Sequence, residues 1–340
     1  MNGGDFIEDN RFWRSKKTKA TDWYNWVEEV LKNKDRFVMP PKMSIPQDSG
    51  NYYHIMPAMY EDENIVTVKM IGRHFLKENE KRPTMMADMM LYEADTGILK
   101  ALMDAEYITT LRTGVVAAHS AIKFVKKDFD TLGLIGLGNI MTVFFITFIN
   151  KLRDGNDNRK LVVKLYKHHQ QEVRFAERFS NLENITFIYC DTYEEVITDT
   201  DLVVSTVTKA DKNFVADECF KQGITVIPIC TLGFQNCDLF FDKVFTDEIE
   251  QIRGFKYFNK FKAVANVSDV LNLKKKGREN NEERIIVYNY GLGIHDLYFA
   301  KKFYELADVN DIDYFYPKSK YFIWGSFRYF SVDLVAFYQQ

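Results

Sequence analysis

The chain has 340 residues and carries 45 lysines and arginines against 48 aspartates and glutamates, for a net charge of −3. The length predicts two ordinary domains rather than one large one, and the balanced charge gives no reason to expect nucleic acid or an anionic membrane as partner, so we expect a small-molecule substrate. The four cysteines stand singly, with no C-x-x-C pair and no histidine at metal-ligand spacing, which indicates neither a zinc site nor a disulfide framework.

The first third of the chain predicts a helix followed by short strands. Residues 21–34, TDWYNWVEEVLKNK, have an N-cap candidate in Thr21 or Asp22 and apolar residues at helical spacing, which predicts a short amphipathic helix. From residue 51 to 105 come short β-rich pieces, among them YYHIMPAMY and NIVTVKMIGR, separated by EDEN, KENEKRP and DTG. This spacing predicts an antiparallel meander.

The remainder predicts a doubly wound parallel sheet. A helical stretch, ITTLRTGVVAAHSAIKFVKK, precedes six strand candidates with helical or loop segments between them: TLGLIGL, LVVKLYK, ITFIYC, LVVSTV, TVIPICT and KVFTD. This alternation is typical of the α/β class with a parallel sheet. Beyond a charged loop, ERIIVYNYGLGIHDLYFAKKFYELA predicts a last strand, a glycine turn and a helix.

Neither end of the chain has the pattern of a membrane segment. The N-terminus lacks the apolar core of a signal peptide, and no internal run reaches the roughly eighteen residues of a transmembrane helix. The aromatic tail after Pro317 is interrupted by Lys320, Arg328 and Asp333, and we expect it to serve packing or a subunit interface. We therefore expect a cytoplasmic protein with reduced thiols.

A glycine turn, Gly136-Leu137-Gly138, follows one predicted strand and precedes an apolar helix that begins near Asn139 and Ile140. In a nucleotide-binding turn the first glycine permits the bend, the second lets the backbone approach the pyrophosphate, and free N–H groups of the helix start hold the phosphates. Met141 replaces the third glycine of the G-x-G-x-x-G pattern, so the motif alone is weak. Its position between strand and helix predicts a dinucleotide site.

The end of the next strand bears on which dinucleotide binds. NAD enzymes carry an Asp or Glu there, which accepts hydrogen bonds from the adenosine ribose, but this strand ends in Lys167 and His168. A carboxylate would repel a 2′-phosphate whereas Lys167 would attract one, so we expect NADP(H) in preference to NAD(H). The alternative is that Lys167 and His168 are ordinary solvated loop residues.

Taken in order, these motifs resemble those of the ornithine cyclodeaminase and mu-crystallin family, and most closely the branch that contains the N-(2-amino-2-carboxyethyl)-glutamate dehydrogenase. The resemblance implies a Rossmann-type domain at residues 126–294, inserted into an α+β substrate and dimerisation domain at 1–125 plus 295–340 with an antiparallel sheet. The matching pieces, spread over roughly residues 37–307, are Pro41-Lys42, Met56-Pro57, Val68-Lys69, Asp95-Thr96-Gly97, Leu111-Arg112-Thr113, the Gly136 turn, and NYGLGIHD at 289–296.

The resemblance also implies a reaction in which hydride moves between a nicotinamide and the carbon that bears an amino group of an amino acid, through an imine. Arg112 matches the carboxylate-binding arginine of the family, and a planar guanidinium suits bidentate binding. Lys42 matches another basic carboxylate contact, and Lys69 matches the lysine at the reacting centre. The two lysines could instead be surface residues at strand edges, and Arg112 could pair within its helix.

Lys69 lies within IVTVKMIG, residues 65–72. Strict alternation along a strand places Lys69 on the face of Ile65, Thr67 and Ile71. This mixed face suits the wall of a pocket. A β-bulge within the strand would instead place Lys69 on the other face.

Several further positions lie at or near pocket or cofactor positions of the family. His54 and Met56 are expected to line the substrate pocket, although a packed strand histidine is the plainer state of His54. Asp296 follows the last glycines, and we expect it to cap the helix that begins there. The remaining positions are expected cofactor contacts, namely Thr84, Thr206, Val207, Leu232, Gly291 and Gly293. Arg112 is expected to contact the cofactor as well as the substrate carboxylate.

One departure from the family narrows the reaction. Cyclodeaminases carry an Asp in the loop after the strand TVIPIC, where this chain has TLGFQNCD at residues 231–238. No acid stands at the matching position, and Asp238 better matches a later acidic position of the same loop. We therefore expect a homodimeric NAD(P)H-dependent oxidoreductase that acts on the CH–NH bond of an amino acid derivative, with an amino acid and a 2-oxo acid as small-molecule partners. The alternatives are a cyclodeaminase for ornithine or lysine with tightly bound NAD, and a non-catalytic protein that binds a nicotinamide nucleotide.

Overall fold

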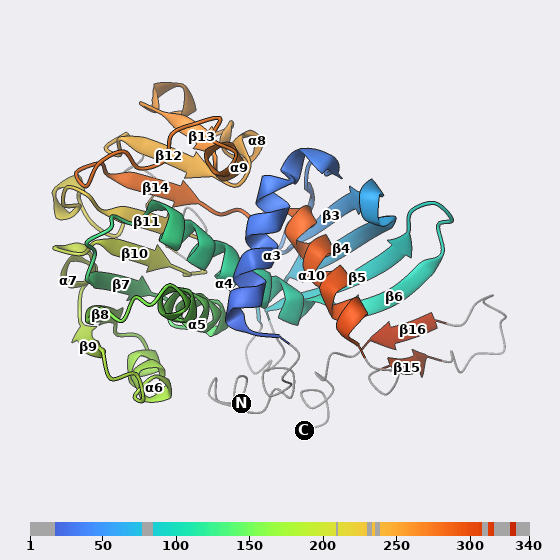
Figure 1. Ribbon diagram of the computed structural model, residues 1–340, viewed down its shortest axis with the longest axis horizontal. Coiled ribbons are helices and arrows are strands. Elements are labelled where there is room, and N and C mark those ends of the chain that lie inside the picture. Colours follow the sequence, from blue (N-terminus) through green and yellow to red (C-terminus); the bar gives the residue numbers. More distant parts are fainter. Residues whose placement is uncertain are drawn as a thin grey trace. The chain divides into compact units, whose positions relative to one another are not determined.

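The computed structural model forms two compact units (Figure 1). We call them the parallel-sheet unit, which holds Lys19–Lys32 and Thr113–Gly291, and the antiparallel-sheet unit, which holds Asn33–Arg112 and the chain from Leu292 onward. The α/β class with one parallel and one antiparallel sheet is confirmed, and the predicted domain limits at 125/126 and 294/295 stay a prediction. The structure describes residues 18–76, 84–208, 210–229, 233–234 and 239–307, and the backbone of 312–315 and 327–330.

The parallel-sheet unit is built on parallel strands that pair, within the described residues, in the order β13-β12-β14-β11-β10-β7-β8-β9. The order reverses at β7, because β8 and β9 lie on one side of it and β10 on the other. Doubly wound sheets bind their ligands outside the carboxyl ends of the strands at such a switch point. The strands are β7 (Thr131–Ile135), β8 (Leu161–Tyr166), β9 (Ile185–Cys190), β10 (Leu202–Ser205), β11 (Thr225–Pro228), β12 (Lys243–Thr246), β13 (Val264–Asn266) and β14 (Ile285–Tyr288).

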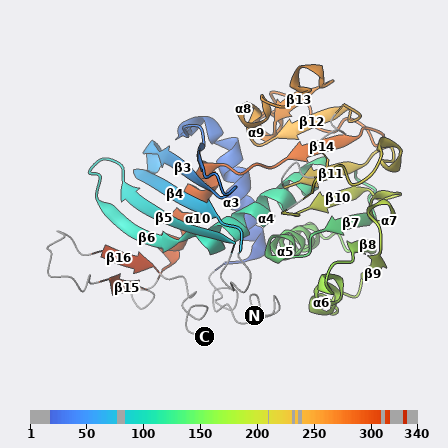
Figure 2. The ribbon, with the colours of Figure 1, turned by 180° about the vertical axis from the view of Figure 1, so that it is seen from behind.

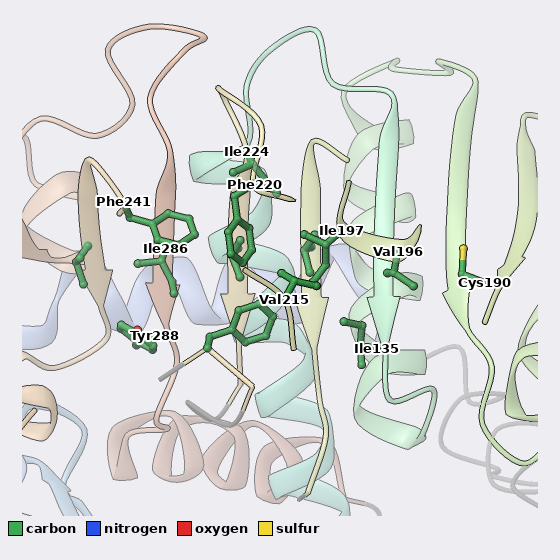
Figure 3. Close-up of a cluster of buried hydrophobic side chains, with 14 of the residues drawn as sticks. Ile135, Cys190, Val196, Ile197, Val215, Phe220, Ile224, Phe241, Ile286 and Tyr288 are labelled. Atoms are coloured by element: carbon green, nitrogen blue, oxygen red, sulfur yellow. The ribbon is translucent and has the colours of Figure 1, made fainter. Parts of the chain in front are cut away.

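The core of this unit follows from its apolar strands. Every residue of β10, β11 and β14 is buried, as expected of strands that are covered on both faces. Figure 3 shows part of one buried cluster that extends across the sheet and includes Ile135 of β7, Ile197 of α7 and Ile286 of β14. The α-helices within this unit are α5 (Asn139–Asp154), α6 (Gln171–Arg178), α7 (Tyr193–Ile197), α8 (Ile249–Ile252) and α9 (Val267–Leu271).

Helix α3 (Ala20–Lys32) also belongs to the parallel-sheet unit, and it confirms the predicted helix at 21–34 with slightly different ends. It contacts α5 and buries Trp23 and Val27. Its Glu28 lies 3.5 Å from His119 of α4 (Ala105–Phe124). None of the helices formed by the described residues has the length and apolar character that a bilayer crossing requires.

The antiparallel-sheet unit contains the predicted meander. Strands β3 to β6 follow one another in antiparallel pairs, and β1 and β2 both pair with β3. Near the C-terminus β15 (Ile312–Phe315) pairs with β16 (Phe327–Phe330), and β16 joins β6 in a parallel pair that the sequence did not predict. The other strands are β1 (Phe37–Val38), β2 (Met43–Pro46), β3 (Tyr52–Tyr60), β4 (Ile65–Arg73), β5 (Met85–Glu93) and β6 (Leu99–Asp104).

The two faces of this sheet differ. Helix α10 (Gly293–Leu306) contacts β3, β4 and β5, and it lies in front of the sheet in Figure 1 and behind it in Figure 2. Under it the β4 residues Ile65, Thr67, Lys69 and Ile71 are buried. The opposite face, which we call the open face, exposes large apolar side chains, including those of Val38, Met43, Ile45, Met70 and Met86.

Candidate functional site

The most unusual side chain of the antiparallel-sheet unit is the fully buried lysine Lys69 on β4. Strict alternation along β4 places it beside Thr67 and Ile71 on the face under α10, as the sequence predicted. Its Nζ donates to Oδ2 of Asp296 at 2.6 Å and to Oγ1 of Thr109 at 3.3 Å. Buried lysines are rare unless they are paired, so this position marks a candidate reacting centre.

Asp296 is the anion of this centre. It comes from the first turn of α10, and its side chain is 1 % exposed. Besides the Lys69 contact, Oδ1 of Asp296 accepts from Nε of Arg112 at 2.9 Å. The prediction that Asp296 caps α10 is therefore wrong: Leu292 is the N-cap residue, and the two buried cations take up the carboxylate instead.

The charges of this triad depend on one another. Burial lowers the pKa of Lys69, Asp296 raises it, and the neighbouring cations Arg112 and Lys42 lower it further, with a result of about 7. Burial alone would raise the pKa of the Asp296 carboxyl, but Arg112 and Lys69 hold it below its ordinary value. At neutral pH Lys69 is thus divided between ammonium and amine beside a permanent carboxylate, which is the state that suits a group that transfers protons.

Arg112 uses only part of its guanidinium for this contact. Its Nε binds Asp296, whereas its two terminal nitrogens make no hydrogen bond to the described residues. The side chain is 7 % exposed. A guanidinium that offers two parallel N–H groups is suited to a bidentate carboxylate contact, so the predicted carboxylate-binding role of Arg112 is compatible with its pairing to Asp296.

Lys42, Met56 and His54 lie on the same side of the sheet as Lys69. Met56 pairs with Lys69 across β3 and β4, and the β2–β3 register, continued by one residue, sets Lys42 opposite Met56. Residues opposite one another in antiparallel strands project from the same face. His54 is half-buried two residues away, and burial together with Lys42 and Lys69 lowers its pKa to about 4. His54 is therefore a neutral hydrogen-bonding group at physiological pH.

The glycine turn after β7, in the parallel-sheet unit, requires its first glycine. Gly136 has φ +83°, and a Cβ there would lie 3.0 Å from Oγ1 of Thr206 and 3.1 Å from the backbone N of Val207. The Thr206 hydroxyl donates to the Gly136 carbonyl, and its backbone N–H donates to the carbonyl of Ile135. The turn is thus fastened to the carboxyl end of β10, at the switch point of the sheet.

The start of α5 presents a backbone that a ligand can approach. Gly138 is the N-cap residue, and a Cβ there would meet nothing within 4 Å. Asn139 is exposed and Ile140 half-buried, so the first N–H groups of the helix lie near the surface. Met141, at the third glycine position, is fully buried. Close packing of α5 is provided instead by Gly114 of α4, where a Cβ would lie 2.7 Å from the Ile140 carbonyl oxygen.

Two buried polar atoms at strand ends of the parallel sheet lack partners among the described residues. They are Oγ of Ser205, at the end of β10, and Nδ2 of Asn289, just after β14. Asn289 accepts from the Ser120 hydroxyl at 3.1 Å through its other side-chain atom. Unsatisfied buried polar groups are costly. Together with the Gly136 turn they fit a polar ligand such as a dinucleotide along the carboxyl ends of β7, β10 and β14.

Lys167 and His168 are exposed after β8, and Lys167 Nζ donates to both carboxylate oxygens of Asp191, at 2.9 and 3.0 Å. Gly291 has φ +83° and its N–H donates to Oδ2 of Asp247 at 2.7 Å.

In the antiparallel-sheet unit Thr84 is exposed before β5, and a Cβ at Gly293 would lie 3.1 Å from the Pro57 carbonyl oxygen. Leu232 lies outside the described residues, as does most of the loop in which cyclodeaminases carry an Asp. Nowhere in the described ranges do His, Cys, Asp and Glu gather into a group that could hold a metal ion.

Sequence reasoning missed Asp296 and Asp191. Asp296 contacts Lys69 in the buried triad, and Asp191 contacts Lys167 at the end of β8. Both lysines were predicted site residues. Two buried cations call for an anion nearby, and this need could have pointed to Asp296.

Comparisons with known proteins extend this picture. The model of the ornithine cyclodeaminase/mu-crystallin family matches residues 14–310. The N-((2S)-2-amino-2-carboxyethyl)-L-glutamate dehydrogenase of Staphylococcus aureus is 24 % identical over 297 residues, which cover 81 % of this chain and 86 % of that one.

Two solved structures have the same fold. The Thermococcus litoralis Delta(1)-pyrroline-2-carboxylate reductase, in complex with NADH and L-proline, superimposes with a TM-score of 0.72 at 21 % identity, covering 85 % of this chain and 94 % of that one. An archaeal alanine dehydrogenase dimer with bound NAD superimposes with a TM-score of 0.73 at 24 % identity, covering 85 % and 91 % of the two chains.

Proposed function

We infer the function from the premise that this chain belongs to the ornithine cyclodeaminase/mu-crystallin family. The chain is an NAD(P)-dependent oxidoreductase that acts on the CH–NH bond of an amino acid derivative, by imine reduction or by the reverse oxidation. The observation that carries this function is the buried triad of Lys69, Asp296 and Arg112. It holds a lysine with a pKa of about 7 beside an arginine whose terminal nitrogens make no hydrogen bond to the described residues.

Imine reduction needs a hydride at carbon and a proton at nitrogen. The nicotinamide supplies the hydride when it is bound. The ammonium form of Lys69 donates the proton to the substrate nitrogen. In the oxidative direction, the neutral amine form of Lys69 accepts that proton. Because its pKa is about 7, both forms are populated at neutral pH, so one residue serves both directions.

The other side chains position the substrate. The terminal nitrogens of Arg112 bind the α-carboxylate. Lys42, which directly precedes β2, and His54 of β3 also contact the substrate. Asp296 holds both Lys69 and Arg112, so it orients the proton donor relative to the carboxylate site. Because both of its carboxylate oxygens accept from these two side chains, Asp296 acts as a positioning residue.

The cofactor is a nicotinamide dinucleotide. Gly136, Gly138, Asn139 and Ile140 would hold its phosphates at the start of α5, and Thr206 and Val207 lie beside the same turn. We propose NADP(H) in preference to NAD(H), because the exposed cation Lys167 and its neighbour His168 stand at the end of β8. Lys167→Asp should shift the preference toward NAD(H), and an enzyme that already prefers NAD(H) before mutation contradicts this part of the proposal.

We also propose that two copies of the chain associate through the open face. Its exposed methionines and aliphatic residues lie on strands of one sheet, and contiguous apolar surface of this kind marks interaction sites. A structurally similar alanine dehydrogenase is a dimer.

Sedimentation of the chain should give about twice its mass of 40.0 kDa, and the variant Met70→Asp should give monomers. The matched control Ile188→Asp, at an exposed β9 residue, should leave the dimer intact, and a monomeric wild type contradicts the proposal.

The test of the function is cofactor oxidation with paired substrates. The absorbance of NADPH or NADH should fall in the presence of a 2-oxo acid with an amino acid, or of a cyclic ketimine. Release of ammonia from ornithine or lysine without net cofactor change would replace this function by cyclodeamination. If Lys69→Met and Arg112→Met leave every turnover unchanged while nucleotide still binds, the triad is not catalytic.

A further inference from the structure

The ends of β8 and β9 carry an exposed ion pair, of which the proposed function uses only Lys167. Lys167 follows β8 directly, and its Nζ lies 2.9 and 3.0 Å from the two carboxylate oxygens of Asp191, which follows β9. The two side chains are 41 % and 72 % exposed. Lys167 is the residue expected to attract a 2′-phosphate, so its partner in the free protein bears on which cofactor binds.

The pair is held by a built arrangement. The rings of Tyr166 and Tyr193, which flank it along the chain, stack at 4.1 Å with an interplanar angle of 17°. The backbone N–H of Lys167 donates to the carbonyl of Cys190, so the two strand ends stay in register. The N–H of Asp191 donates to a carboxylate oxygen of Glu195 at 2.8 Å. The backbone of both Lys167 and Asp191 is therefore held in place by hydrogen bonds. Their exposed side-chain ends can change partners.

The loop after Lys167 is also constrained. His169 and Gln170 have φ of +50° and +60°, a left-handed conformation that residues other than glycine seldom adopt. Glu172 accepts from the His168 N–H at 3.0 Å, and Arg174 donates to the His169 carbonyl at 3.0 Å. Backbone held in sparsely populated conformations clusters at functional sites, which is consistent with a ligand at this strand end.

We propose that Asp191 sets the selectivity between a phosphorylated and an unphosphorylated adenosine ribose, by competing with the 2′-phosphate for Lys167. The proposal rests on the proposed function, because it needs the adenosine at the end of β8. In doubly wound sheets the acid that accepts hydrogen bonds from the ribose stands at the end of the second strand. Here that strand ends in Lys167, and the neighbouring third strand supplies the acid.

Binding of a 2′-phosphate requires Lys167 to exchange one anionic partner for another. A free ribose hydroxyl can donate to the Asp191 carboxylate while Lys167 keeps its partner. A 2′-phosphate carries a charge of about −1.5 to −2 at neutral pH, so it must take Lys167 from Asp191 and then lie beside a carboxylate of the same sign. Glu172 and Glu195 add negative charge around Lys167, and with Asp191 they raise its pKa. Repulsion between the Asp191 carboxylate and the 2′-phosphate disfavours binding of the phosphorylated ribose. Asp191 therefore weakens the preference for NADP(H) that Lys167 alone would give.

Binding of two adenosine nucleotides to the full chain tests this directly, without turnover. Adenosine 2′,5′-bisphosphate and AMP differ only in the 2′-phosphate, and their dissociation constants can be measured by calorimetry at low and moderate salt. We expect Asp191→Asn to tighten the bisphosphate by about three- to tenfold and to leave AMP unchanged or weaker. The gain should shrink as salt rises, since exposed charges are screened.

Two further variants sharpen the measurement. In a Lys167→Met background the same Asp191→Asn change should have a smaller effect, because no cation is released and only the direct repulsion is removed. Asp154→Asn removes a second exposed aspartate of the parallel-sheet unit, which pairs with Lys151 at 3.3 Å at the far end of α5. It should change neither affinity.

The outcomes separate the two claims. If both nucleotides bind the wild type and Asp191→Asn leaves their affinity ratio unchanged, the role of Asp191 is wrong and the proposed function stands. A ratio that moves in favour of AMP also contradicts the role. If neither nucleotide binds the wild type, the dinucleotide site at this strand end is wrong, and both claims fall together.

Discussion

Lys69 and Lys167 make the same kind of contact in very different surroundings. Each binds an aspartate, with Nζ–O distances of 2.6 and 2.9 Å. Yet the pKa of Lys69 is lowered to about 7, mainly by burial, whereas hydrogen bonding to Asp191 raises that of the exposed Lys167. The pairing alone does not determine the behaviour of a lysine. Burial and the sign of the next nearest charges decide whether it is poised to release a proton or only to hold an anion.

The largest difference between the two lysines is expected in turnover, when each is replaced by methionine. Lys69→Met removes the proton donor, and we expect turnover to fall by about 10²- to 10⁴-fold, the range that general acid–base groups contribute. Nucleotide binding should persist, because the Gly136 turn is untouched. The matched variant Lys167→Met should alter affinity for NADP(H) while leaving turnover at saturating cofactor within a small factor. Equal losses of turnover in the two variants would contradict the distinction.

The second effect is on stability. Asp296→Asn leaves two buried cations without their anion, and we expect a loss of about 3–5 kcal/mol in the free energy of unfolding, as for other broken buried pairs. Urea titrations followed by circular dichroism measure it. Asp191→Asn is the control, since exposed pairs often contribute nothing measurable. If the two variants unfold at the same urea concentration, the triad does not hold the antiparallel-sheet unit together.

The third effect is on the pH dependence of turnover. Imine reduction needs the protonated form of Lys69, so its rate should fall as the pH rises through about 7, and oxidation of the amine should instead rise through the same value. Lys42 lowers the pKa of Lys69, so Lys42→Met should move both midpoints to higher pH. Lys34→Met, which removes a lysine outside the site, should leave them in place. Midpoints that move to lower pH in Lys42→Met would show that the sign is wrong.

The smallest effect is on cofactor choice. Lys167→Asp should shift the ratio of dissociation constants from NADP(H) toward NAD(H), and by less at high salt, because exposed charges are screened over about 10 Å at 0.1 M ionic strength. Competition binding measures the ratio. A shift of the same size at low and high salt would indicate a buried determinant instead.

Much of the fold could be predicted from local patterns. Alternation placed Lys69 on the face of Thr67 and Ile71, and the sequence of apolar strands gave the parallel sheet with its turn at Gly136. These features depend on periods of two or on a few neighbouring residues, which a single sequence carries directly. The parallel pairing of β16 with β6 joins segments more than 200 residues apart, and no local pattern indicates it.

The sequence predicted the cationic residues of the candidate site but not the anionic residues that pair with them. Lys42, Lys69 and Arg112 were recognised by position in motifs, whereas Asp296 was read as a helix cap because its local context, after two glycines, fits one. Its actual partners lie 227 and 184 positions away in the sequence. Asp191 was missed for a similar reason: the end of β8 was considered by itself, although the neighbouring parallel strand ends beside it.

The central claim is that Lys69 is poised near neutrality inside the antiparallel-sheet unit. The most direct measurement is a nitrogen-detected NMR titration of the side-chain amines in lysine-labelled protein. We expect one lysine resonance that titrates near pH 7 and is missing in Lys69→Met. If every lysine of the folded protein titrates above about pH 9, in its ordinary range, Lys69 is a permanent ammonium and the proposed proton transfer is wrong.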